Sequence, residues 1–224
     1  MIRRGLLRLV TPIVWRVPGH GARKLHGFAR AEQGSRIDLL QAAQRTGSLA
    51  RRAQYLRHAL DETRHASMFW RRGNELARRP SGPPIADTEN LFETLGERRF
   101  LAFVHLGERR GREQFELYAR HFGKRGDART EALFGAILID EHHHEDYTRA
   151  LLVELCGGEA GARRELRRAT LWDAWRTWRR AGRGLAGALY TLVMTVIYLV
   201  IGPIAALGLR LRRTSRADRW SGRS

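Results

Sequence analysis

Residues 61–65 read Asp-Glu-Thr-Arg-His, and residues 140–144 read Asp-Glu-His-His-His. Each stretch contains the pattern Glu-x-x-His, which pairs Glu62 with His65 and Glu141 with His144. Residues three positions apart share one face of a helix, so each pattern can offer a carboxylate and an imidazole to one metal ion. One such pattern arises by chance in many charged helices. Two of them, each beginning with the same Asp-Glu pair, indicate a paired metal site.

The sequence around these motifs predicts an all-α fold. No strand-like alternation occurs in the chain, and helical stretches are expected at about 22–46, 48–79, 87–122 and 128–156. Ser48 is a favoured N-cap for the second helix. The run PSGPP at 80–84, the run FGKRGD at 122–127 and Gly157-Gly158 separate or end the helices. Short connections imply antiparallel neighbours, so we predict an up-down four-helix bundle with the two motifs on its second and fourth helices.

The other two helices are expected to supply one carboxylate each. In helical bundles that hold two carboxylate-bridged ions, two helices provide Glu-x-x-His and the other two provide a single Glu. The first helix has only Glu32 as an acid before Asp38, so Glu32 is the candidate there.

The third helix offers three acids, Glu108, Glu113 and Glu116. Glu32 precedes Glu62 by 30 residues and Glu108 precedes Glu141 by 33, as in a weak internal repeat. This spacing favours Glu108, and Glu113 is the alternative.

The predicted ligands are Glu32, Glu62, His65, Glu108, Glu141 and His144. Four carboxylates neutralise much of the charge of two close metal ions, and carboxylate-imidazole sets suit iron or manganese. We expect two iron ions, with manganese as the alternative. The competing interpretation is a set of buried salt bridges, but buried Glu and His are costly without partners. His142 and His143 do not have the required spacing and are expected at the surface or outside the ligand shell.

These motifs resemble those of the ferritin-like di-iron carboxylate superfamily, over about residues 22–157. The pattern Asp-Glu-x-Arg-His at 61–65 resembles the dioxygen-activating branch, which includes bacterial multicomponent monooxygenases and the ribonucleotide reductase small subunit. The resemblance implies a ferritin-like antiparallel four-helix bundle, with Asp61, Asp140 and Arg64 supporting the metal ligands from outside. The second motif differs, because His143 stands where the branch has Arg.

The charge distribution indicates a membrane surface as a partner. Residues 1–30 hold seven Lys/Arg and no acid, residues 31–157 hold 20 basic and 19 acidic residues, and residues 158–224 hold 14 basic and four acidic residues. Basic ends beside apolar runs fit anionic lipid better than nucleic acid, which would require a basic folded domain. No nucleic-acid partner is therefore expected. The single cysteine, Cys156, excludes an intrachain disulfide and is compatible with a bundle on the cytoplasmic side.

Five segments are expected along the chain. They are a basic amphipathic segment at 1–21, the bundle at 22–158, a Trp/Arg-rich interfacial helix at 159–183, a transmembrane segment at 184–209 and a basic tail at 210–224. The 26 uncharged residues of 184–209 exceed the ~20 that a bilayer core requires. A re-entrant hairpin is the alternative to a single span, and Pro203 is expected to kink or end the helix.

The expected function is that of a membrane-anchored non-haem di-iron oxygenase or oxidase. Small size and membrane attachment are similar to demethoxyubiquinone hydroxylases and alternative oxidases, which implies dioxygen, an apolar quinone- or lipid-like substrate and a separate electron donor. The first alternative, similar to rubrerythrins and ferritins, is an iron-oxidising or peroxide-consuming protein without an organic substrate. The second is a non-enzymatic membrane scaffold. A second copy of the chain, in a homodimer, is a further candidate partner.

Overall fold

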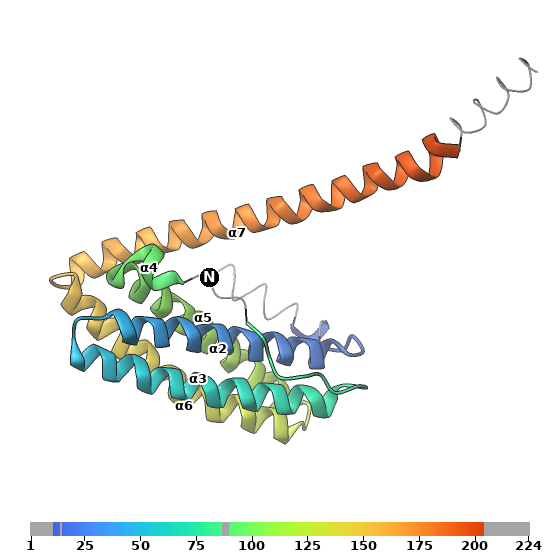
Figure 1. Ribbon diagram of the computed structural model, residues 1–224. Coiled ribbons are helices and arrows are strands. Elements are labelled where there is room, and N and C mark those ends of the chain that lie inside the picture. Colours follow the sequence, from blue (N-terminus) through green and yellow to red (C-terminus); the bar gives the residue numbers. More distant parts are fainter. Residues whose placement is uncertain (1–10, 14, 87–89, 204–224) are drawn as a thin grey trace, which may run out of the picture. The chain divides into compact units, whose positions relative to one another are not determined.

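The computed structural model describes residues 11–203 except residue 14 and residues 87–89, and this part of the chain is all-α. Its main elements are α2 (His20–Arg45), α3 (Leu49–Leu76), α4 (Leu91–Leu95), α5 (Glu97–Lys124), α6 (Ala128–Leu155), α7 (Glu159–Val196) and the π-helical η1 (Ile197–Ile201). Four long helices, α2, α3, α5 and α6, pack as a bundle (Figure 1). The predicted fold class is confirmed at this level.

Local sequence sets the start of α3 and the end of α6 where they were predicted, whereas the third long helix, expected from about residue 87, begins as α5 only at Glu97, after the short helix α4. The side chain of Ser48 accepts a hydrogen bond from the backbone N–H of Arg51 at 3.3 Å, so Ser48 is the N-cap of α3. At the end of α6, Gly157 and Gly158 take φ values of 67° and 116°, which side chains rarely adopt. The N–H of Gly158 bonds the carbonyl of Val153 at 2.8 Å and closes the helix.

The connection between the two helical hairpins differs from the short loop that an up-down bundle requires. Glu97, at the start of α5, bonds Thr46 at 2.7 Å and Arg51 at 2.9 Å, beside the turn between α2 and α3. Arg72, near the end of α3, bonds Asp127 at 3.0 Å, just before α6. Helices α3 and α5 therefore begin at the same end of the bundle, while each hairpin, α2/α3 and α5/α6, is antiparallel. Between α3 and α5, the described residues 77–86 and 90–96, which include α4, lead back toward the start of α5, as Figure 1 shows.

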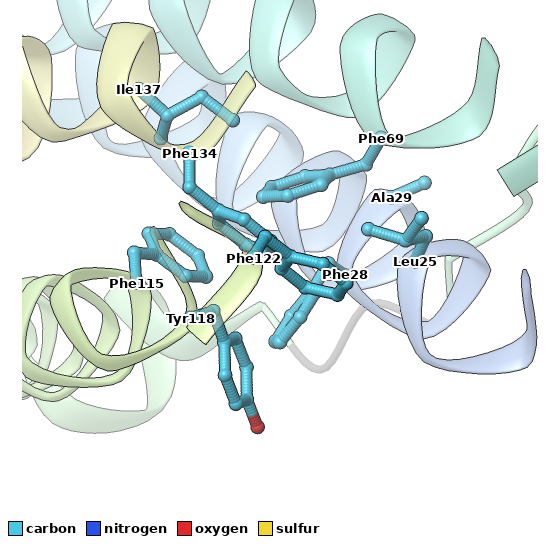
Figure 2. Close-up of a cluster of buried hydrophobic side chains, with 9 residues drawn as sticks. All are labelled: Leu25, Phe28, Ala29, Phe69, Phe115, Tyr118, Phe122, Phe134 and Ile137. Atoms are coloured by element: carbon cyan, nitrogen blue, oxygen red, sulfur yellow. The ribbon is translucent and has the colours of Figure 1, made fainter. Parts of the chain in front are cut away.

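An aromatic layer fills the part of the bundle near the start of α2 (Figure 2). Phe28 contacts Phe69 and Phe115 with ring centroids 5.1 and 5.2 Å apart, and Phe134 lies 5.7 Å from Phe69. The remaining buried members are Leu25, Ala29, Tyr118, Phe122 and Ile137. All four long helices contribute, so this layer fixes their mutual positions on one side of the His/Glu cluster.

The first three turns of α7 pack on the bundle. Ala162 and Ala169 are fully buried, and Arg99 of α5 bonds Glu165 at 3.0 Å. The chain divides into two compact units between Leu171 and Trp172.

The segment predicted to span a membrane, 184–209, extends beyond the described residues, which end at 203. Within the described part of the chain, no helix is both long enough and apolar enough to cross a membrane. Helix α7 runs unbroken from Glu159 to Val196, so residues 159–183 and 184–196 form one helix. A π-helical turn, Ile197–Ile201, follows just before Pro203, where a helix disturbance was expected. Most of the segment 1–21 and all of the tail 210–224 lie outside the described residues.

Candidate metal centre

The interior of the bundle holds a cluster of imidazoles and carboxylates from all four long helices. Its residues form two sets, and within each set the ligand atoms, one per residue, all lie within 4.8 Å of one another. Glu62 belongs to both sets. The first set consists of His58, Glu62, Glu108 and His144, and the second of Glu32, Glu62 and His65. All of these residues except Glu32, which is partly buried, are buried. A buried His/Glu cluster of this composition is consistent with a di-metal carboxylate site.

Several polar atoms in this cluster have no hydrogen-bond partner in the described part of the chain. They are Glu62 Oε2, His65 Nδ1 and His144 Nδ1. The two Nδ1 atoms approach carboxylate oxygens only to 3.7–3.9 Å, which is too far for a hydrogen bond. Unpaired buried polar atoms are costly, and metal cations bound between them would satisfy all three. The residues present therefore fit a metal pair.

The other nitrogen of each of these two imidazoles is held by an aspartate from the opposite motif. His65 Nε2 donates to Asp140 Oδ2 at 3.0 Å, and His144 Nε2 donates to Asp61 Oδ2 at 3.2 Å. Arg64 Nη2 bonds both aspartates, at 3.0 Å to Asp61 and 2.5 Å to Asp140. Carboxylate partners of this kind fix the tautomer and direct the inner nitrogen toward a metal. The three residues expected to support the ligands thus link the two motifs across α3 and α6.

His58 belongs to the cluster, although neither Glu-x-x-His motif predicts it. It lies one helical turn before Glu62, and its Nε2 is 3.0 Å from Glu62 Oε1 and 3.5 Å from Glu108 Oε1. Its Nδ1 bonds the hydroxyl of Tyr147, one turn after His144, at 2.6 Å. The i, i+4 spacing from Glu62 places His58 on the same face of α3 and was the available signal. A Glu-x-x-His pattern indicates only positions after each glutamate, and His58 precedes Glu62.

Burial and mutual repulsion dominate the electrostatics of the carboxylates. Burial, reinforced by the neighbouring acids, raises the pKa of Glu62 and Glu141 well above the ordinary value. Burial also raises the pKa of Glu32. For Glu108, burial acts in the same direction, but the adjacent His58 and His144 outweigh it and lower the pKa. Like charges in a dry interior explain why this cluster needs either protons or metal cations.

The imidazoles divide into two types. Burial lowers the pKa of His58 to about 3, so this ring is neutral and can offer a lone pair. Burial would also lower the pKa of His144, but the carboxylates of Glu108 and Asp61 raise it instead. A metal ion at His144 Nδ1 would therefore have to compete with a proton for that nitrogen.

The remaining candidates lie around the cluster. Glu141 is buried but belongs to neither ligand set, and its Oε1 is 3.7 Å from His65 Nδ1. Glu113 is partly buried and also outside both sets, while Glu116 bonds Arg112 at 2.5 Å. The structure therefore places Glu108, and not Glu113, in the cluster with Glu62 and His144. His142 and His143 are both exposed, as expected.

Comparisons with protein-family models, with curated proteins and with solved structures give no significant match for this chain.

Proposed function

We propose that the protein is a non-haem di-iron oxidoreductase that activates dioxygen, with Glu32, Glu62, His65, Glu108, Glu141 and His144 as metal ligands. The observation that carries this proposal is the pair of ligand sets sharing the buried Glu62. Carboxylates with few imidazoles favour iron or manganese over metals that prefer nitrogen or sulfur. A pair of such ions, when bound, supplies electrons to dioxygen and so allows oxidation of a second molecule.

The residues around the cluster support redox chemistry by keeping it dry and rigid. Phe28 lies one turn before Glu32, Phe69 one turn after His65, and Ile137 one turn before Glu141, all within the aromatic layer (Figure 2). A low-dielectric surrounding strengthens every interaction of a buried charge. The Arg64 bridge between Asp61 and Asp140 holds two imidazoles in place. Preorganised ligands and exclusion of water suit an oxygen-activating site better than a site that must release iron.

An apolar, quinone- or lipid-like substrate is part of the same proposal. In the second unit, Trp175 and Trp178 stack with ring centroids 5.1 Å apart, and both are more than half exposed. Farther along α7, Leu189 and Leu192 are each 60% exposed. Aromatic and aliphatic side chains interspersed with Arg favour the interface of an anionic bilayer. Attachment to a membrane on its cytoplasmic side would place the protein where such substrates are found, and a separate reductase would supply electrons.

Anaerobic loading followed by controlled exposure to oxidant tests this function. Metal-free protein receives two equivalents of Fe(II), and the rates of Fe(II) oxidation by dioxygen and by hydrogen peroxide are compared. We expect faster oxidation by dioxygen, and repeated turnover when a reductant and a short-chain quinol are present. Asp61→Asn should slow the reaction, because the amide cannot hold His144 as a carboxylate does.

The competing functions predict different results. A peroxide-consuming protein would oxidise Fe(II) faster with peroxide than with dioxygen and would ignore the quinol. A scaffold would bind no iron at stoichiometric concentration. Either result would overturn the proposed oxygenase or oxidase function.

A further inference from the structure

We propose that His58 is a third metal-binding imidazole, so that the two ions of the centre are held unequally. This inference rests on the proposed di-metal site and extends it by one residue. One ion would be held by His58, Glu62, Glu108 and His144, and its neighbour by Glu32, Glu62 and His65, with Glu62 shared. Glu141, whose Oε1 lies 3.7 Å from His65 Nδ1, would join the second set.

The position of His58 meets the geometric requirement for a ligand. Its side chain is completely buried, and its Nε2 faces Glu62 Oε1 at 3.0 Å and Glu108 Oε1 at 3.5 Å. Its ring stacks on His144 with a centroid distance of 3.7 Å and an interplanar angle of 28°. Four ligand atoms, two nitrogens and two oxygens, are therefore gathered around one point.

The second nitrogen of His58 has a partner outside the cluster. His58 Nδ1 lies 2.6 Å from the hydroxyl of the buried Tyr147. A metal-binding histidine nearly always uses its other nitrogen to donate to an oxygen, which sets the tautomer and ring direction. His65 and His144 use Asp140 and Asp61 for this purpose. With a metal on Nε2, the Nδ1–H of His58 would donate to Tyr147 in the same way.

The orientation of the ring also distinguishes His58 from the other two imidazoles. His65 and His144 turn Nδ1 inward and Nε2 outward, whereas His58 turns Nε2 inward and Nδ1 outward. The partner of His58 is a neutral phenol and not a carboxylate. A histidine that only balanced the charge of Glu62 would need neither this second anchor nor a place against His144.

The chain contains a matched comparison in His105, another buried histidine on the facing helix α5. His105 Nδ1 is 3.1 Å from Thr148 Oγ1 and 3.2 Å from the carbonyl of Glu145. It belongs to neither ligand set. Burial and a hydrogen-bond partner are thus common to both residues, and only His58 faces the carboxylates.

Unequal ligand sets predict unequal metal affinities. A set with two imidazoles prefers cobalt, nickel or zinc more strongly than a set with one, while carboxylate-rich sets suit manganese and iron. Titration of metal-free protein with Co(II) should show two binding steps. His58→Phe, which keeps a ring against His144, should weaken one step by about tenfold or more and leave the other nearly unchanged.

Proton NMR of the Co(II)-loaded, full-length protein counts the bound imidazoles directly. Each bound histidine contributes one strongly shifted N–H signal, so we expect three signals in the natural protein. His58→Phe should show two signals, and His105→Phe should keep all three. Tyr147→Phe should also keep three, but with one of them displaced, because only the anchor of His58 is lost.

The outcomes separate this inference from the proposed function. Two N–H signals in the natural protein, unchanged in His58→Phe, would remove His58 from the ligand set while leaving the di-metal site intact. The number of shifted N–H signals in the natural protein shows whether His58 binds the metal, even if the His58→Phe variant does not fold. Failure of the natural protein to bind Co(II) at all would instead overturn the di-metal site and this inference with it.

Discussion

At the scale of single residues, Gly111 shows how closely the helices fit around the cluster. It lies on α5, three residues after Glu108, and a Cβ at this position would come within 3.2 Å of Glu141 Oε2. Gly107, one turn earlier on the same helix, has nothing within 4 Å of the corresponding point. A side chain at Gly111 would therefore crowd the carboxylate of Glu141, whereas a side chain at Gly107 would meet no neighbour.

Alanine at these two glycines should have different consequences for the metal centre. Gly107→Ala should stabilise the protein by up to about 1 kcal/mol through helix propensity, with metal affinity unchanged. Gly111→Ala should gain the same propensity but displace the carboxylate of Glu141, so metal binding should weaken. Thermal unfolding and Co(II) titration of both variants make the comparison. Equal metal affinities would show that Glu141 is not held in place beside Gly111.

Glu108 and Glu113 provide a second matched pair. Glu108→Ala should weaken metal binding by more than the ~10–100-fold typical of losing a partner outside the ligand shell. Glu113→Ala should leave two metals per chain, because Glu113 lies outside both ligand sets. Metal content after desalting gives the answer. Loss of metal in Glu113→Ala with retention in Glu108→Ala would reverse the assignment on α5.

Sequence spacing predicted the residues that share a helix face more readily than those that meet across the bundle. The i, i+3 rule brought Glu62 and His65 together, and the repeat selected Glu108. The hydrogen bond of Tyr147 to His58 joins α6 to α3 across 89 positions, and no local pattern encodes it. The crossed pairing, in which Asp61 holds His144 and Asp140 holds His65, also depends on how the helices are aligned.

At the scale of elements, Asp127 caps α6 and ties it to α3. Its Oδ1 accepts from the N–H of Thr130 at 3.0 Å and from Arg72 at 3.0 Å. Burial alone would raise the pKa of Asp127, but the hydrogen bonds from Thr130 and Arg72 outweigh it and lower the pKa below 3.8. A lowered pKa in the folded state means that the ionised carboxylate stabilises the fold.

The sign of this shift gives a pH-dependent prediction. Asp127→Ala should reduce the free energy of unfolding by about 1–2 kcal/mol at pH 7, and Asp127→Asn by less, because the amide still caps the helix. The stability due to the charge is present above pH 3.8 and is lost as pH falls through the lowered folded-state pKa. Urea unfolding should be followed from pH 7 to 3.5 for the natural protein and both variants. The difference in the free energy of unfolding between the natural protein and each variant should become smaller only near pH 4. A difference that stays constant to pH 3.5 would contradict this role.

Most helix boundaries were predictable because capping and breaking residues act locally, whereas the start of α5 and the path between the hairpins were not. PSGPP at 80–84 ended the second helix as expected, since α3 stops at Leu76. The direction of α5 depends on contacts of Glu97 with Arg51 and Tyr55, 46 and 42 positions away. Such contacts leave no periodic trace in the sequence, so short loops and an up-down order were assumed.

At the scale of the whole molecule, the first unit should fold and bind metal without the second. A chain ending at Leu171 keeps the Arg99–Glu165 bond and the buried Ala162 and Ala169, so it should fold and bind two metals. A chain ending at Gly158 keeps every proposed ligand but loses these contacts, so it should bind metal with a lower melting temperature. The full-length chain should sediment with anionic vesicles in high salt, and the chain ending at Leu171 should not. Co-sedimentation of the chain ending at Leu171, or its failure to bind metal, would contradict this division.

The most direct test of the central claim is anomalous diffraction at the iron edge from crystals of the iron-loaded protein. We predict two anomalous peaks inside the bundle, about 3.5–4 Å apart as in other two-metal sites. Glu62 should touch both ions, Glu108 and His144 should lie on one side, and Glu32 and His65 should lie on the other. A single peak, or peaks confined to the exposed His142 and His143, would show that α2, α3, α5 and α6 do not enclose a di-iron centre.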